Sequence, residues 1–176
     1  AINKLGRFYA ETIADRVKVD YGVIFGPAYK GIPLAVSCAS SLFAHFGIDK
    51  DYSFNRKEAK EHGDASGIIV GKPLTKDDKL ILIDDVVTAG TAIRETIEIL
   101  KQVGSPKIVS IVVSVDRMEK GMGELSAIQE LKNDLGVEFY PIVNIIEIME
   151  YLKTKKIVAD DIYDKMVEYR KKYGIE

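Results

Sequence analysis

Two adjacent carboxylates, Asp84 and Asp85, stand between an apolar run and a Thr/Gly-rich turn in the stretch LILIDDVVTAGTAIRE, residues 80–95. If the turn opens a helix, residues 88–91 present free backbone N–H groups and hydroxyls where helices bind phosphate. The acids can accept hydrogen bonds from sugar hydroxyls, or hold Mg²⁺ through water. The stretch therefore predicts a sugar-phosphate site. The alternative is an acidic helix entry with Thr91 as its N-cap.

A second candidate is the glycine-flanked loop GPAYKGIP, residues 26–33, which carries Lys30. Its lysine can pair with a phosphate, and its glycines allow backbone amides to do the same. An ordinary tight turn with a solvated lysine explains the loop equally well when it is considered alone.

A third candidate is the charged segment 56–62, whose cations are Arg56, Lys57, Lys60 and His62. A solvated charged face is the usual explanation, because Lys57 and Glu61 have the i,i+4 spacing of a helical ion pair. The glycines at positions 63 and 67 instead favour a mobile basic loop that closes over a polyanion and excludes water.

Arg117 follows Asp116 just after an apolar run, in SVDRMEKGMGELSAIQE. A guanidinium can clamp a carboxylate with two parallel hydrogen bonds. A surface ion pair is the alternative, and the residues do not decide between the two.

The elements that must position these residues alternate between short apolar strands and amphipathic helices. Strands are expected near 22–25, 52–55, 68–71, 79–83, 107–115 and 137–143. Helices are expected before the first strand, after the last and in most of the intervals, except that 52–55 and 68–71 are joined by a hairpin-like segment. This order predicts an α/β fold with a mostly parallel, twisted sheet flanked by helices. In such sheets ligands bind beyond the carboxyl ends of the strands. The loops that begin at 26, 84 and 116 should therefore face one crevice.

The composition excludes several classes. The 176 residues suit one domain, residues 1–176, and the net charge of −2 with a pI near 5.8 gives no support for binding nucleic acid. No apolar run reaches the length of a membrane span. The single cysteine, Cys38, cannot form an internal disulfide, which favours a cytoplasmic location.

Taken together, these motifs resemble those of the type I phosphoribosyltransferases. The run 80–95 is similar to their motif for phosphoribosyl pyrophosphate, and FGPAYKGIPLA, FNRKEAKEHG and SVDRMEKGMGELSAIQE resemble the orotate phosphoribosyltransferase family in particular. The resemblance implies a phosphoribosyltransferase-type fold with a mobile basic hairpin loop. It also implies Mg²⁺-dependent transfer of phosphoribosyl to orotate, giving orotidine 5′-monophosphate and pyrophosphate in pyrimidine biosynthesis.

The resemblance also implies roles for single residues. Lys60, His62, Asp84 and Asp85 are the expected catalytic residues, and Thr88 and Arg117 the expected contacts of orotate. Phosphoribosyl pyrophosphate would be bound by Tyr29, Lys30, Arg56, Lys57, Lys60, His62, Asp84, Asp85, Val86, Val87, Thr88, Ala89, Gly90, Thr91 and Ala92. Mg²⁺ would be held mainly through substrate and water, with no direct protein ligand.

The family resemblance further implies a homodimer in which loop residues reach the neighbouring subunit's site. Members of the family carry an upstream segment that nothing in this chain matches, so that segment is expected to be missing or trimmed. Two alternatives stay open at this stage. A purine phosphoribosyltransferase usually lacks the FNRKEAKEHG loop, and a regulator that senses phosphoribosyl pyrophosphate without catalysis typically loses it.

Overall fold

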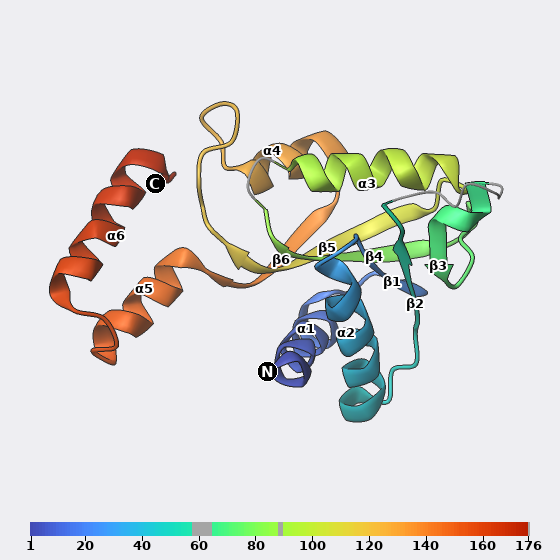
Figure 1. Ribbon diagram of the computed structural model, residues 1–176, viewed down its shortest axis with the longest axis horizontal. Coiled ribbons are helices and arrows are strands. Elements are labelled where there is room, and N and C mark those ends of the chain that lie inside the picture. Colours follow the sequence, from blue (N-terminus) through green and yellow to red (C-terminus); the bar gives the residue numbers. More distant parts are fainter. Residues whose placement is uncertain (58–64, 88–89, 176) are drawn as a thin grey trace.

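The computed structural model describes residues 1–57, 65–87 and 90–175. It contains a six-stranded sheet in the order β3-β2-β1-β4-β5-β6 (Figure 1). All neighbouring strands are parallel except β3, which pairs antiparallel with β2. The strands are β1 (Val23–Gly26), β2 (Asp51–Asn55), β3 (Ile69–Gly71), β4 (Lys79–Val86), β5 (Lys107–Asp116) and β6 (Glu138–Asn144). The predicted mostly parallel α/β sheet is confirmed.

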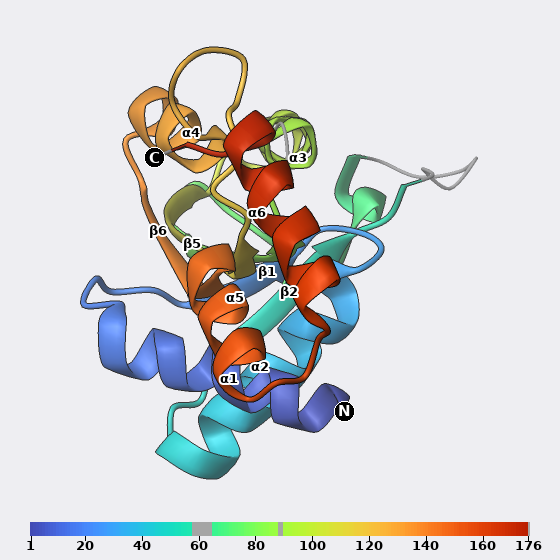
Figure 2. The ribbon, with the colours of Figure 1, turned by 90° about the vertical axis from the view of Figure 1, so that its left-hand side faces the viewer.

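Helices cover both faces of this sheet. They are α1 (Ile2–Arg16), α2 (Gly31–Phe46), α3 (Thr91–Gln102), α4 (Ala127–Leu135), α5 (Ile145–Thr154) and α6 (Asp160–Tyr173), with a short 3₁₀ helix η1 (Ala65–Ile68) before β3. Helices α1 and α2 lie on one face, and α3 and α4 on the other (Figure 1). Helices α5 and α6 follow β6 and extend away from the sheet (Figure 1), so they face the viewer in Figure 2.

The central strand β4 is buried on both faces, which explains its unbroken apolar sequence. Side chains alternate along a strand, so Ile81 and Ile83 pack under α1 and α2, whereas Leu82 packs with α3 and α4. Two apolar cores therefore fix β4 between two helical layers. The strand is longer than the sequence analysis predicted, because it continues through Val86 and includes both aspartates.

Because the five strands β1, β2, β4, β5 and β6 are parallel, their carboxyl ends meet at one edge. The chain leaves β1 for β2 on one side and passes from β4 to β5 on the other, so the order reverses between β1 and β4. Such a reversal opens a crevice at the strand ends. In the described residues no helix is both long and apolar enough to cross a membrane.

Candidate active site

Asp84 lies in β4 at the bottom of the crevice and is only 9% exposed. Its Oδ1 accepts a hydrogen bond from the backbone N–H of Asp85 at 2.8 Å. Burial raises the pKa of this carboxyl from 3.8 to about 6, because the charged form loses water. Such a shift, in a buried acid at a strand end, is typical of a functional site.

Asp85 stands in a different environment. Its Oδ2 accepts a hydrogen bond from Lys30 Nζ at 2.9 Å, across the space between β4 and the loop after β1. Partial burial pushes the pKa of Asp85 upward, but the hydrogen bond and charge of Lys30, together with hydrogen bonds from the Val86 backbone and from Asp84, outweigh it, so the pKa lies below its ordinary value. The same hydrogen bond raises the pKa of Lys30. The adjacent acids thus differ in protonation behaviour.

The loop that carries Lys30 is held closely against the sheet. A Cβ at Gly26 would lie 2.1 Å from the Gly31 carbonyl oxygen, so only glycine allows the chain to turn back so tightly. The Ala28 N–H donates to Asn55 Oδ1 at 3.0 Å, and the peptide bond between Ala28 and Tyr29 is cis. The amide of Asn55, at the end of β2, therefore fixes the loop.

The phosphate-binding turn predicted at 88–91 is partly described. Gly90 is the N-cap of α3 with φ +75°, and Thr91 is the first helical residue rather than the cap. The first backbone N–H groups of α3 have no partner within the helix itself, which makes this end suited to an anion. A cavity of about 300 Å³ lies there, lined by Asp84, Val86, Val87, Gly90, Thr91, Ala92, Ile93 and Glu95.

A second cavity of about 560 Å³ adjoins the first, because the two share Asp84, Val86 and Ala92. It is lined by Pro27, Ala28, Tyr29, Lys30, Lys57, Asp84, Asp85, Val86, Ala92 and Arg117. The predicted convergence of three strand-end loops on one crevice is therefore confirmed. The end of β2 contributes a fourth segment through Lys57.

The basic segment after β2 is only partly described. Lys57 Nζ lies 5.3 Å from the centre of the Tyr29 ring, in cation–π contact at the cavity wall. Arg56 is exposed, and its N–H bonds to the Ile68 carbonyl across the β2–β3 pair. Lys60 and His62 lie outside the described residues, as do Thr88 and Ala89, so the predicted mobile loop stays a prediction.

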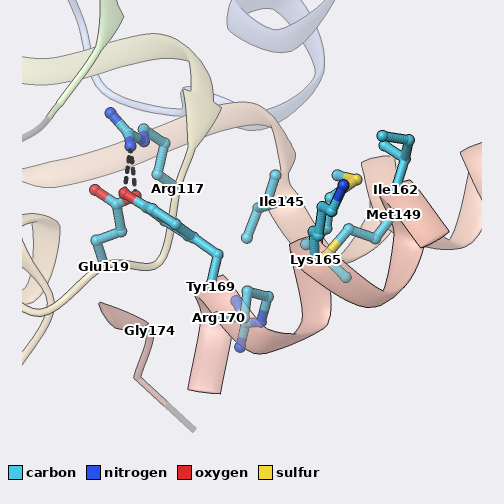
Figure 3. Close-up of a pocket in the computed structure, with 10 residues that line it drawn as sticks. Arg117, Glu119, Ile145, Met149, Ile162, Lys165, Tyr169, Arg170 and Gly174 are labelled. Carbon is cyan, nitrogen blue, oxygen red and sulfur yellow. Dashed lines mark hydrogen bonds and ion pairs between the residues drawn. The ribbon is translucent and has the colours of Figure 1, made fainter. Parts of the chain in front are cut away.

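Arg117 follows β5 and lines the larger cavity. Its Nη2 donates to Glu119 Oε1 at 2.5 Å and to the Tyr169 hydroxyl at 3.2 Å, as Figure 3 shows. The guanidinium therefore forms the ion pair of the second alternative, while Arg117 also lines the larger cavity. The clamp on a carboxylate stays a prediction.

Three residues of this region were not predicted from the sequence. Asn55 holds the Lys30 loop, and Tyr169 contacts Arg117 from α6. Tyr9, fully buried in α1, donates to the Asp84 carbonyl at 2.7 Å and lies 2.5 Å from Ser114 Oγ. Burial raises the pKa of the Tyr9 hydroxyl, which stays protonated. In the sequence, the only indication of this contact is the hydroxyl that Tyr9 carries within a largely apolar face of the first helix.

The donor set bears on the expected metal. In the described part of the chain, no three His, Cys, Asp or Glu side chains gather as a metal-binding group. Asp84 lines both cavities and the adjacent Asp85 lines the larger one, so two carboxylates stand next to each other at this site. Two carboxylates fit a Mg²⁺ ion that keeps several waters and takes its remaining ligands from substrate phosphates.

Comparisons with known proteins agree with this geometry. The family model of the phosphoribosyl transferase domain matches residues 1–140, and the single domain over residues 1–176 stays a prediction. The chain is 46% identical to the orotate phosphoribosyltransferase of Lachnoclostridium phytofermentans, over 99% of this chain and 80% of that protein.

Solved structures give the same result. The orotate phosphoribosyltransferase of Francisella tularensis has a TM-score of 0.81 and 37% identity, covering 98% of this chain and 80% of its own. The Mycobacterium tuberculosis orotate phosphoribosyltransferase, in complex with 5-phospho-α-D-ribosyl 1-diphosphate, shares the fold, with a TM-score of 0.64 at 21% identity over 83% of this chain and 74% of its own. The chain therefore belongs to the orotate phosphoribosyltransferase family, whose members are pentosyl-transferring enzymes.

Proposed function

We propose that this protein transfers the phosphoribosyl group from phosphoribosyl pyrophosphate to orotate with Mg²⁺, giving orotidine 5′-monophosphate and pyrophosphate. The observation that carries the proposal is the pair Asp84 and Asp85 between an α-helix N-terminus and the cation Lys30, within two joined cavities. A donor with a phosphate at one end and a pyrophosphate at the other needs both sites. This reaction belongs to pyrimidine biosynthesis.

The donor would span the two cavities. The smaller one suits the 5-phosphate, because Gly90, Thr91 and Ala92 line it and belong to the N-terminus of α3, where backbone N–H groups bind anions. Asp84, which lines both cavities, and the adjacent Asp85 suit the ribose hydroxyls. Tyr29 and Lys30 in the larger cavity suit the pyrophosphate. The ion pair between Lys30 Nζ and Asp85 Oδ2, 2.9 Å apart, would separate when the lysine binds the pyrophosphate instead.

The chemistry required is charge stabilisation. Breaking the bond from C1 to pyrophosphate builds positive charge on the ribose, as in glycoside cleavage. Asp84 and Asp85 favour that charge, whereas Lys30 and Lys57 favour the negative charge on the leaving pyrophosphate. Asp84, whose pKa is about 6, is largely ionised at neutral pH and can act as an anion. Lys60 or His62 would serve as acid toward the leaving group.

Mg²⁺ would be bound by the substrate, with Asp84 and Asp85 holding its waters. When bound, it neutralises charge on the pyrophosphate and orients it. Arg117 would meet the polar edge of orotate, because it lines the larger cavity and not the smaller one assigned to the 5-phosphate. Thr88 would contribute a second contact.

We propose a homodimer in which Arg56, Lys60 and His62 reach the neighbouring site. Supporting this, the outer surface of α2 exposes the large apolar side chains Val36, Phe43 and Phe46, with Phe43 63% exposed. Such exposed apolar surface is typical of an interface. We also propose a cytoplasmic location, supported by the unpaired, buried Cys38.

The test is orotate-dependent release of pyrophosphate from phosphoribosyl pyrophosphate, with Mg²⁺ and with a chelator. We expect turnover that needs both orotate and Mg²⁺. Purine bases in place of orotate test the alternative purine enzyme. Calorimetry with the donor alone tests the sensing alternative, which predicts binding without turnover with any base.

A further inference from the structure

Tyr169 is the one residue of α6 whose side chain bonds to a residue of the candidate active site, among the described residues. Its hydroxyl accepts a hydrogen bond from Arg117 Nη2 at 3.2 Å, and the same nitrogen donates to Glu119 Oε1 at 2.5 Å (Figure 3). Both bonds use one guanidinium nitrogen. Within the described residues, the N–H groups on Nε and Nη1 form no hydrogen bond, so they can bind a ligand in the larger cavity, which Arg117 lines.

The end of α6 is fastened to the short segment that carries Arg117. The Ile175 N–H donates to the Met118 carbonyl at 2.8 Å, and the Lys120 N–H donates to the Tyr173 carbonyl at 2.9 Å. Glu119 and Gly174 form an isolated antiparallel bridge between these bonds. The position of α6 is thus coupled to residues 118–120, which directly follow Arg117.

This attachment is not explained by burial of the helix. Within α6, all of which the structure describes, no side chain is fully buried. Instead Tyr169 and Arg117 both line an apolar cavity of about 330 Å³, with Ile145, Met149, Ile162, Lys165, Met166 and Arg170 among its other residues. The centroids of the Tyr169 and Tyr173 rings are also 4.7 Å apart. The ring is therefore supported on one side, and its hydroxyl is directed at the guanidinium (Figure 3).

We propose that Tyr169 is a positioning residue for Arg117, and that α6 therefore forms part of the subsite that recognises orotate. This rests on the proposed function. An arginine side chain has many rotamers, and holding one nitrogen against Glu119 and Tyr169 reduces the ordering needed when substrate binds. The guanidinium then presents a fixed edge to the planar, anionic substrate, where geometry matters as much as charge.

The experiment compares steady-state kinetics of the wild-type chain and the Tyr169→Phe variant, which loses only the hydroxyl. We expect the KM for orotate to rise about three- to tenfold, as for the net loss of one ordinary hydrogen bond, because the effect reaches the substrate only through Arg117; kcat and the KM for phosphoribosyl pyrophosphate should stay within about twofold. Tyr151→Phe is the matched control, because Tyr151 is exposed on α5 and lines neither cavity of the active site. It should leave all three constants unchanged.

A double-mutant cycle separates positioning from general loss of structure. In an Arg117→Lys background, which removes the planar fork, adding Tyr169→Phe should change the orotate KM by less than about twofold. Additive effects in the cycle, an unchanged orotate KM in Tyr169→Phe, or equal losses for both substrates would each overturn the proposal. If the wild-type chain turns over orotate and Tyr169→Phe has the wild-type KM for orotate, this inference is wrong and the proposed function stands. Absence of wild-type turnover sinks the proposed function and this inference with it.

Discussion

Lys30 Nζ and Asp85 Oδ2 lie 2.9 Å apart, although the two residues belong to a loop after β1 and to the end of β4. The pair joins the two sides of the larger cavity at the point where the strand order reverses. Both groups are partly open to water, and the Lys30 side chain is 78% exposed. A pair so exposed adds little to stability, so its position at the cavity favours a role in binding.

Lys30→Gln should therefore reduce activity far more than stability. The pyrophosphate end of the donor loses a cation, so we expect kcat/KM for phosphoribosyl pyrophosphate to fall about ten- to a hundredfold. The midpoint of urea unfolding should change little, because exposed pairs contribute about 0–1 kcal/mol. Lys76→Gln, at a distant exposed lysine, is the control. If kcat/KM for phosphoribosyl pyrophosphate is the same in the two variants, Lys30 does not contact the donor.

Asp84→Asn should stabilise the fold at neutral pH and abolish most activity. The folded state raises the pKa of Asp84 from 3.8 to about 6, so between these values it binds more protons than the unfolded chain. The free energy of unfolding therefore falls as pH rises from about 4 to about 6. Asparagine removes this penalty, on the order of 1–3 kcal/mol.

The measurement for Asp84→Asn is urea unfolding from pH 4 to 8 beside the wild type. The difference in unfolding free energy between variant and wild type should grow from pH 4 to 6 and then stay constant. Asp85 provides a contrast, because its pKa is lowered in the folded state. Its contribution to stability is present above the ordinary pKa of an aspartate, 3.8, and is lost as the pH falls from there through the lowered pKa. A variant that is less stable than wild type at pH 7 would contradict the stated environment of Asp84.

Asn55→Ala should loosen the loop that carries Lys30. Asn55 is 4% exposed, and its loss leaves the Ala28 N–H without its 3.0 Å partner. We expect a loss of about 1–3 kcal/mol in unfolding free energy and a raised KM for phosphoribosyl pyrophosphate. Asn55→Asp keeps an acceptor for that N–H and should recover part of the KM. A KM unchanged in Asn55→Ala would show that the loop is fixed by other contacts.

Gly90→Ala should damage the phosphate end of the site. Gly90 has φ +75°, and a Cβ there would lie 2.8 Å from Leu131 Cδ1. The backbone strain costs about 1–2 kcal/mol, and relieving it shifts the first N–H groups of α3. Binding of phosphoribosyl pyrophosphate, measured by calorimetry, should weaken at least about tenfold. Gly47→Ala, at φ +66° in the C-cap of α2, carries similar strain away from the site and should lose stability without losing affinity.

The proposed sharing of sites across a dimer predicts subunit complementation. Lys60→Ala and Asp84→Asn should each be inactive, but subunits that are unfolded and refolded together should recover about a quarter of wild-type activity. Half of the dimers are then mixed, and each mixed dimer holds one intact site. A mixture as inactive as its components, or a monomeric mass by light scattering, would contradict sharing of Lys60 between subunits.

The sequence by itself determined the alternation of strands and helices, because apolar periodicity and glycine positions are local properties of the chain. It also placed Asp84 and Asp85 at a strand end before a helix. Since parallel strands align their carboxyl ends, these local facts were enough to predict that Lys30, Asp84 and Arg117 face one crevice.

Only the tertiary structure decided which side chains support those residues. Tyr9 reaches Asp84 from 75 positions away, and Tyr169 reaches Arg117 from 52. The difference in pKa between Asp84 and Asp85 also follows from the burial of Asp84 and from the contact of Asp85 with Lys30. Neither the burial nor the contact can be deduced from the sequence next to the two aspartates. Hydrogen bonds and desolvation act through space, so contacts between distant segments are fixed only when the sheet and its helices have packed.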